Sequence, residues 1–152
     1  MEEYNFFAEQ ADILSCDCST IKKAYVKDGN LHLKTDSFLY GDKNPYKCDC
    51  LLILERFSLI DEQANADIIP LERRKECKEI AANRNLHLYL TFDEFLESSC
   101  VEVQGFDFEW EKQCLTITGY DGNEDKALWC SLKFHFQNIT AYWNEEKSLF
   151  EV

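Results

Sequence analysis

The chain has 152 residues, a length that fits one domain of ordinary size and buries a core without needing a metal or a disulfide. Hydrophobic residues make up 45% and aromatic residues 14% of the sequence, which excludes the disordered class. Sixteen Lys and Arg against 29 Asp and Glu leave a net charge of −13, which nucleic-acid phosphates and anionic membranes repel. We expect a single domain over residues 1–152. Its charge either maintains solubility or attracts a basic protein.

The N-terminal residues lack the basic and apolar regions of a secretion signal. No stretch approaches the roughly 18 apolar residues that span a bilayer. The sequence therefore predicts a cytoplasmic protein with reduced cysteines.

The first expected elements are two short alternating segments, residues 24–27 and 31–34, separated by Asp28-Gly29-Asn30. Asp-Gly between alternating segments predicts a hairpin, because glycine reaches the positive φ that a tight turn requires. Residues 50–54 are apolar on both faces, which predicts a strand covered on both sides near the middle of the structure.

The chain contains eight cysteines, and most lie in apolar, strand-like segments, where a free cysteine behaves as a small core residue. The alternative is a four-thiolate zinc site formed by Cys16, Cys18, Cys48 and Cys50, since residues two apart on a strand point the same way. Neither pair has the C-x₂₋₄-C spacing of the usual zinc knuckle. Core packing is therefore the favoured interpretation, and no cofactor is expected.

The middle of the chain is expected to hold two helices around a short strand. Pro70 is well placed to start a helix over residues 71–82, whose apolar stripe is thin: Cys77, Ile80 and Ala81. Residues 86–90 are typical of a strand. Thr91 with Glu94 then forms a capping-box pattern, which predicts the start of a second short helix.

The last third has the clearest strand pattern. Period-two alternation predicts that aromatic side chains face inward and the acids between them outward, over Phe106, Asp107, Phe108, Glu109, Trp110 and Glu111. The inward phase changes at Gly105, which predicts a β-bulge there. Residues 114–118 and 128–136 are the next expected strands, the second with Trp129, Lys133 and His135 on its outer face.

The two strand-rich ends resemble each other at a spacing of 80 residues. The matching positions are Tyr40, Cys50, Leu52 and Leu54, then Tyr120, Cys130, Leu132 and Phe134. An internal duplication explains the match, and so does the monotony of β patterns. The expected fold class is α+β and predominantly antiparallel β. It is a sandwich or curled barrel of two similar three-stranded units, with one or two short helices from the middle of the chain.

The sequence contains no phosphate-cradling Gly-rich loop, nucleophile elbow, H-E-x-x-H or dinucleotide fingerprint. A Cys–His pair, such as His135 with one of the thiols, needs an electropositive setting to activate the thiol. The sequence therefore predicts a protein that is not an enzyme. A small-ligand-binding or enzymatic β-barrel is the alternative, which a large, closed apolar pocket would favour.

Negative charge is concentrated in residues 93–125, which hold ten acids and one base, whereas residues 20–60 carry a net charge of +2. Like charges on one strand face repel each other, so these acids form either an ordinary solvated surface or a docking surface for a basic protein. In the docking interpretation, neighbouring aromatic residues supply the anchors. The predicted partner-binding residues are Asp107, Glu109, Glu111, Tyr120, Asp121, Glu124, Asp125 and Trp129.

An acidic chain of this size with an aromatic hairpin and a Leu-x-Phe-x-Phe-x-x-Ile strand resembles the small immunity proteins that neutralise bacterial toxins. The resemblance lies in the C-terminal third, in Phe106, Phe108, Trp110, Leu115, Ile117, Leu132, Phe134, Phe136 and Ile139. It implies one-to-one inhibition of a cognate toxin, often a nuclease, without catalysis. It supplies no fixed functional residues, and abundant cysteines are not one of its features.

Overall fold

The computed structural model describes residues 4, 6–9, 14–16, 19–40, 49–64, 71–85, 87–98, 100–121 and 127–143. The strands are β1 Phe6–Glu9, β2 Leu14–Ser15, β3 Thr20–Lys27, β4 Asn30–Thr35, β5 Leu39–Tyr40, β6 Cys50–Glu55, β7 Ser58–Asp61, β8 His87–Tyr89, β9 Val101–Glu109, β10 Cys114–Asp121, β11 Ala127–His135 and β12 Asn138–Trp143. The helices are α1 Leu71–Asn83 and α2 Phe92–Glu97, with a 3₁₀ turn at Trp110–Lys112. In this described part of the chain, neither helix has the length and apolar character needed to cross a bilayer.

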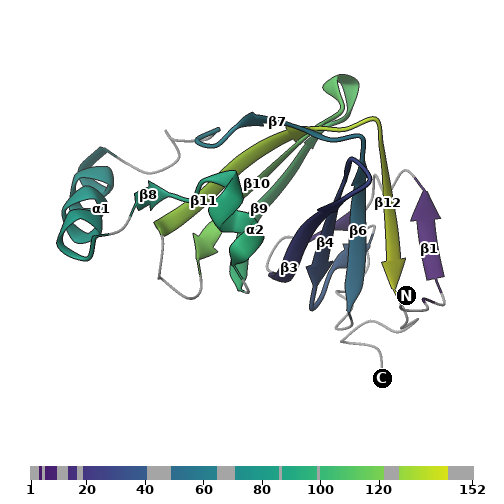
Figure 1. Ribbon diagram of the computed structural model, residues 1–152, viewed down its shortest axis with the longest axis horizontal. Coiled ribbons are helices and arrows are strands. Elements are labelled where there is room, and N and C mark those ends of the chain that lie inside the picture. The colour runs from purple at the N-terminus through teal and green to yellow at the C-terminus, as the bar shows by residue number, and fades with distance from the viewer. Residues whose placement is uncertain are drawn as a thin grey trace.

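One large sheet dominates the structure, in the strand order β1-β12-β6-β4-β3-β9-β10-β11-β7, with β8 parallel to β11 and β2-β5 as a separate small pair. The other pairings are antiparallel, so the predicted fold class, predominantly antiparallel β with two short helices, is confirmed. Figure 1 shows the two halves of the sheet at an angle to each other. They meet where β3 pairs with β9 over only two residue pairs.

The two halves repeat one topology about a local two-fold axis. Read outward from the centre of the sheet, β3, β4, β6 and β12 in one half correspond to β9, β10, β11 and β7 in the other. Ser58 and Asn138, which begin the corresponding strands β7 and β12, are 80 residues apart. The axis passes between Thr20 and Glu102, which are paired with each other. Both β3 and β9 carry a register irregularity in the same place, at Lys22 and Gln104. This agreement in register supports an internal repeat over chance similarity of β patterns.

The halves also exchange strands. β6 continues into β7, which pairs with β11 of the other half, and β11 continues into β12, which pairs with β6 of the first half. Figure 1 shows both crossovers at the same end of the sheet. A hydrogen bond from the Gln137 amide to the Glu55 carbonyl, 2.9 Å long, links them. Each half therefore contains a strand that the other half supplies.

Several local predictions are confirmed. Asp28 and Gly29 both have positive φ, 54° and 79°, as the predicted hairpin turn requires. The bulge lies beside Gly105, where Val103 and Gly105 pair with consecutive residues of β10 and Gln104 is left over. The α2 capping box also forms, with the Thr91 hydroxyl accepting from the Glu94 amide and the Glu94 carboxylate accepting from the Thr91 amide.

Two local predictions are wrong. β9 ends at Glu109, so Trp110 and Glu111 lie in the 3₁₀ turn that follows, and Trp110 is 36% exposed instead of inward. The strand at residues 50–54 is also not covered on both sides, because its outward side chains are only half-buried. In both places the pattern predicted full burial of an apolar side chain that is only partly covered: the Trp110 ring packs on Phe108 and Phe136 at the edge of the core, and the outward side chains of β6 are half-buried.

The core lies between the inner faces of the two halves. α2 lies in this core against both halves: it contacts β3 of the first half, and its Phe92 ring contacts the buried Phe134 ring of β11 at 5.6 Å between centroids. Phe95 of α2 is 1% exposed. In Figure 1, α1 lies at the far end of the molecule beside β8. The outer face of the sheet carries no packed helix over β9 and β10 in the described part of the chain. Outward side chains of β9 and β10 are therefore not covered by either described helix.

Candidate functional site

Strand register places a set of predicted residues on one outer face. Tyr120 is paired with Glu102 on one side and with Trp129 on the other, so these three side chains point the same way. Thr116 is paired with Asp107 and Lys133, and Cys114 with Glu109 and His135, again on the outer side. We call this surface the acidic face and define it by five residues: Glu102, Asp107, Glu109, Tyr120 and Trp129.

Two aromatic side chains form one end of the acidic face. The Tyr120 and Trp129 rings lie 4.5 Å apart between centroids, tilted by 46°, and Tyr120 is 38% exposed. Trp129 is only half-exposed, and its Nε1 is buried with no hydrogen-bond partner among the described residues. A buried donor without a partner costs about 1–3 kcal/mol, so this end of the face retains a destabilising group.

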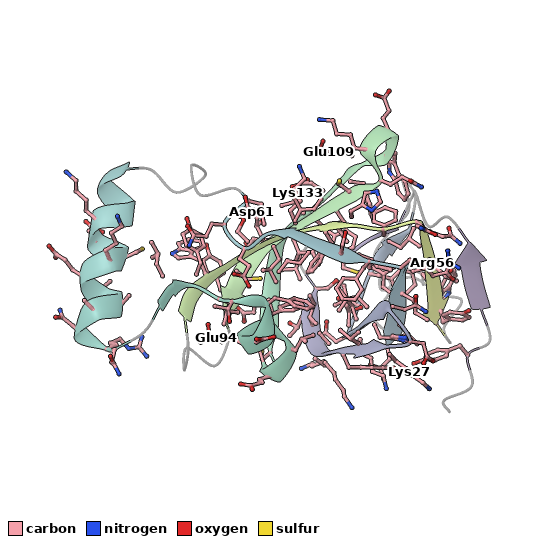
Figure 2. The ribbon with its side chains drawn as sticks, turned by 45° about the horizontal axis from the view of Figure 1, so that its top comes forward. Lys27, Arg56, Asp61, Glu94, Glu109 and Lys133 are labelled. Carbon is pink, nitrogen blue, oxygen red and sulfur yellow. The ribbon has the colours of Figure 1, made fainter. Side chains whose placement is uncertain are left out.

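The carboxylates of the acidic face are not all equivalent. Glu109 Oε1 lies 3.2 Å from Lys133 Nζ, and its Oε2 lies 3.5 Å from Lys112 Nζ. The hydrogen bond and charge of Lys133, with a contribution from Lys112, lower the pKa of Glu109. Figure 2 shows Glu109 and Lys133 close together beside Asp61. Glu102 and Asp107 have no ion pair among the described residues, so they carry the uncompensated charge of the face.

The acids of residues 93–125 do not gather into one patch. Asp93, Glu94 and Glu97 belong to α2, on the inner side of the half-sheet, and Figure 2 shows Glu94 well apart from Glu109. Glu111 is exposed at the 3₁₀ turn and does not continue the row. Expecting a single surface was wrong, because sequence proximity does not reveal which face of the sheet a helix covers. Asp121 ends β10, and Glu124 and Asp125 lie outside the described residues.

The outer face of the first half has the opposite charge. Register places Lys23 opposite Lys34, Tyr25 opposite His32, and Lys27 opposite Asn30. The Tyr25 and His32 rings stack at 4.6 Å with a 12° angle, and Lys23 Nζ lies 5.4 Å from the centre of the Tyr25 ring. Burial, with help from the Lys27 and Lys34 charges, lowers the pKa of His32. The two halves are therefore electrostatically unlike despite their common topology.

The predicted thiolate site is only partly within the described residues, since Cys18 and Cys48 lie outside them. Cys16 and Cys50 are in the core, at 0% and 1% exposure, and both adjoin Thr35: Cys16 through a side-chain hydrogen bond and Cys50 as its strand partner. Burial raises the pKa of the Cys16 thiol to about 12, which opposes the thiolate that a metal requires. No metal-binding cluster of His, Cys, Asp and Glu occurs among the described residues.

The Cys–His pairing considered from the sequence does arise in one place, where His135 is the strand partner of Cys114. Cys114 is 6% exposed, and its Sγ donates to the Lys112 carbonyl oxygen at 3.4 Å. The thiol is therefore buried and oriented toward its own turn, an arrangement typical of a structural cysteine.

Sequence reasoning did not select Glu102, although register makes it the direct neighbour of Tyr120. It also missed Lys133 as the counter-ion of Glu109. The residues of the basic outer face were signalled only by the +2 charge of residues 20–60. Comparisons with family models, with curated proteins and with solved structures found no match for this chain.

Proposed function

We propose that the chain is a non-catalytic binding protein that recognises a basic protein through the acidic face. The observation that carries the proposal is that the exposed Tyr120 ring, packed against the half-buried Trp129 ring, lies directly beside the unpaired carboxylate of Glu102, with that of Asp107 further along the same face. Aromatic side chains supply most of the contact energy at interfaces, and charges around them set orientation and association rate. An acidic rim beside an aromatic pair matches a lysine- or arginine-rich partner surface.

The specific form of the proposal is inhibition of a toxic basic enzyme, the activity implied by the resemblance to immunity proteins. An inhibitor must bind before its target acts, and the net charge of −13 speeds association with a basic protein at low ionic strength. The Trp129 indole Nε1, which has no hydrogen-bond partner among the described residues, also supports a binding role for this face. Functional surfaces commonly retain groups that lower the stability of the protein.

The test is binding to the basic proteins encoded beside the gene for this chain, by co-expression, size-exclusion chromatography and protection of cell growth. The decisive variants are Glu102→Lys/Asp107→Lys and Tyr120→Ala. The matched control is Glu79→Lys/Glu97→Lys, which makes the same change in net charge at exposed positions on α1 and α2.

We expect the charge reversal on the acidic face to weaken a one-to-one complex by at least tenfold, with the control close to wild type. Equal weakening by the two double variants would mean that net charge alone drives binding and would remove the acidic face from the proposal. A complex that tolerates both Glu102→Lys/Asp107→Lys and Tyr120→Ala would place the interface elsewhere.

A further inference from the structure

The internal repeat provides a comparison between two equivalent corners of the molecule. Each corner lies where a strand hairpin meets the crossover between the halves. In the second half the corner is filled: the Trp110 ring packs at 5.9 Å from the Phe136 ring and at 4.4 Å from the Phe108 ring. Phe136 is 1% exposed there. The same topology therefore allows apolar side chains to fill this corner.

The first-half corner is hollow and polar. Asp28 and Trp110 are at equivalent positions, because each directly follows the corresponding strand of its half, β3 or β9. Arg56 and Phe136 are equivalent in the same way, because each directly follows β6 or β11. The result is a recess of 540 Å³ lined by Asp28, Asn30, Glu55, Arg56, Gln137 and Asn138. This volume lies within the roughly 300–1,000 Å³ typical of small-molecule sites.

Both crossovers hold the recess in shape. The Arg56 amide donates to Asn30 Oδ1 at 3.0 Å, as the Phe136 amide donates to the Gln113 carbonyl at 3.0 Å in the filled corner. Arg56 Nη1 donates to Gln137 Oε1 at 3.3 Å. Arg56 also has φ of 49°, a left-handed conformation that costs a non-glycine residue about 1–2 kcal/mol. Figure 2 shows Arg56 at the crossover end of the first half.

The charges in the recess have opposite signs but do not neutralise one another. Arg56 forms no ion pair with Asp28 or Glu55 among the described residues, although all three residues line the same recess. Carboxamide groups of Asn30, Gln137 and Asn138 supply further donors and acceptors. Such a lining favours a ligand that carries both a negative and a positive group a short distance apart.

We propose that this recess binds a free α-amino acid. The Arg56 guanidinium receives the ligand carboxylate, for which its planar pair of donors is suited, and Asp28 and Glu55 both accept from the ammonium group. The carboxamides complete the hydrogen bonding of both groups. The site lies at the hairpin end of the first half and shares no residue with the acidic face, so the inference is independent of the proposed function.

The experiment is a thermal-shift screen of the whole protein with each of the twenty L-amino acids at 10 mM, followed by isothermal titration calorimetry of those that raise the melting temperature. For the tightest binder, its decarboxylated amine and its N-acetyl derivative are titrated in parallel. Each analogue retains one of the two charges, so both are expected to bind at least tenfold more weakly than the amino acid.

Two variants locate the site: Arg56→Gln, which removes the positive group, and Asp28→Asn, which keeps the shape of an exposed turn residue while removing a negative one. We expect each to weaken amino-acid binding at least fivefold, with Arg84→Gln on the other side of the molecule unchanged. The proposal is overturned if no amino acid raises the melting temperature, if either analogue binds as tightly as its parent, or if Asp28→Asn and Arg56→Gln bind normally. Circular dichroism of each variant separates loss of binding from loss of fold.

Discussion

Substituting Gly119 tests a close approach of the backbones of β9 and β10. A Cβ at this position would overlap the carbonyl oxygen of Glu102 and crowd the Cα of Val103, on the neighbouring strand β9. The obstacle is backbone, so β9 and β10 must separate at the bulge to admit a methyl group. Gly119→Ala is therefore expected to be destabilising even though the φ of Gly119 is not positive.

The magnitude follows from three contributions. Overpacking of this kind costs about 1–3 kcal/mol, and loss of one or two ladder hydrogen bonds costs about 0.5–1.5 kcal/mol each. Replacing glycine by alanine also lowers the conformational entropy of the unfolded chain, which stabilises the folded state by about 0.4–1 kcal/mol. With each contribution near the middle of its range, the expected net loss is about 2–4 kcal/mol. At about 2–4 °C per kcal/mol, this lowers the melting temperature by roughly 5–15 °C.

Gly105 provides the matched control, since a Cβ there would overlap the Oγ1 of Thr118, the end of a side chain that can rotate, and would be in ordinary contact with nearby side-chain atoms of Asp107 and Thr118. Gly105→Ala is expected to cost about 1 kcal/mol or less, and Thr118→Ala is expected to remove that cost. Urea unfolding of the single and double variants measures both effects. Gly119→Ala within about 0.5 kcal/mol of wild type would refute the close approach, because a change that small is typical of unconstrained surface positions. Rescue of Gly119→Ala by Thr118→Ala would refute a backbone obstacle.

Three further predictions concern single side chains. Thr91→Ala should lower the unfolding free energy by about 1 kcal/mol through loss of the α2 cap, while Thr91→Ser should be near neutral in the same urea titration. Because burial raises the pKa of Cys16 to about 12, the unfolded chain loses this proton first above about pH 9, and stability falls. Relative to Cys16→Ala, wild type should lose up to about 1.4 kcal/mol per pH unit between pH 9 and 12, and parallel curves would contradict this. Because the pKa of His32 is lowered, the unfolded chain gains a proton first below about pH 6.5, so wild type should lose stability relative to His32→Gln as pH falls, by chemical denaturation.

Local chemistry made several elements predictable. The Asp28-Gly29 turn, the Thr91–Glu94 capping box and the bulge beside Gly105 each depend on residues that are neighbours in sequence. The end of β9 was missed because Trp110 continues the alternating pattern, whereas the backbone turns away after Glu109. Alternation of apolar and polar residues shows which side chains share a face of a strand, but it does not show where the strand ends.

The candidate site was only half predictable for a different reason. The side chains that share a face of one strand follow from alternation, so Asp107 and Trp129 were correctly placed on an outer face. Tyr120 lay beyond the predicted strand, and only the observed register puts it on that face. The separation of the α2 acids from that face depends on Phe92 packing against Phe134, a contact between residues 42 positions apart. No pattern within either segment contains that information.

The exchange of β7 and β12 leads to a final prediction about folding. If the chain is cut between residues 64 and 71, the N-terminal piece retains β7, whose strand partner β11 lies in the other piece. The C-terminal piece retains β12, whose partner β6 lies in the first. Each piece alone would expose both the inner face of its half-sheet and an unpaired strand.

We therefore expect neither fragment to unfold cooperatively by itself, and an equimolar mixture to recover the circular dichroism spectrum and a single thermal transition of the intact chain. A small half-domain of this size is marginal even with a complete sheet, because it buries too little apolar surface to offset its conformational entropy. Cooperative unfolding of either isolated fragment would show that each half is self-sufficient and that the exchanged strands are not what joins them. A mixture that stays unfolded would show that the covalent connection is needed to bring the exchanged strands together.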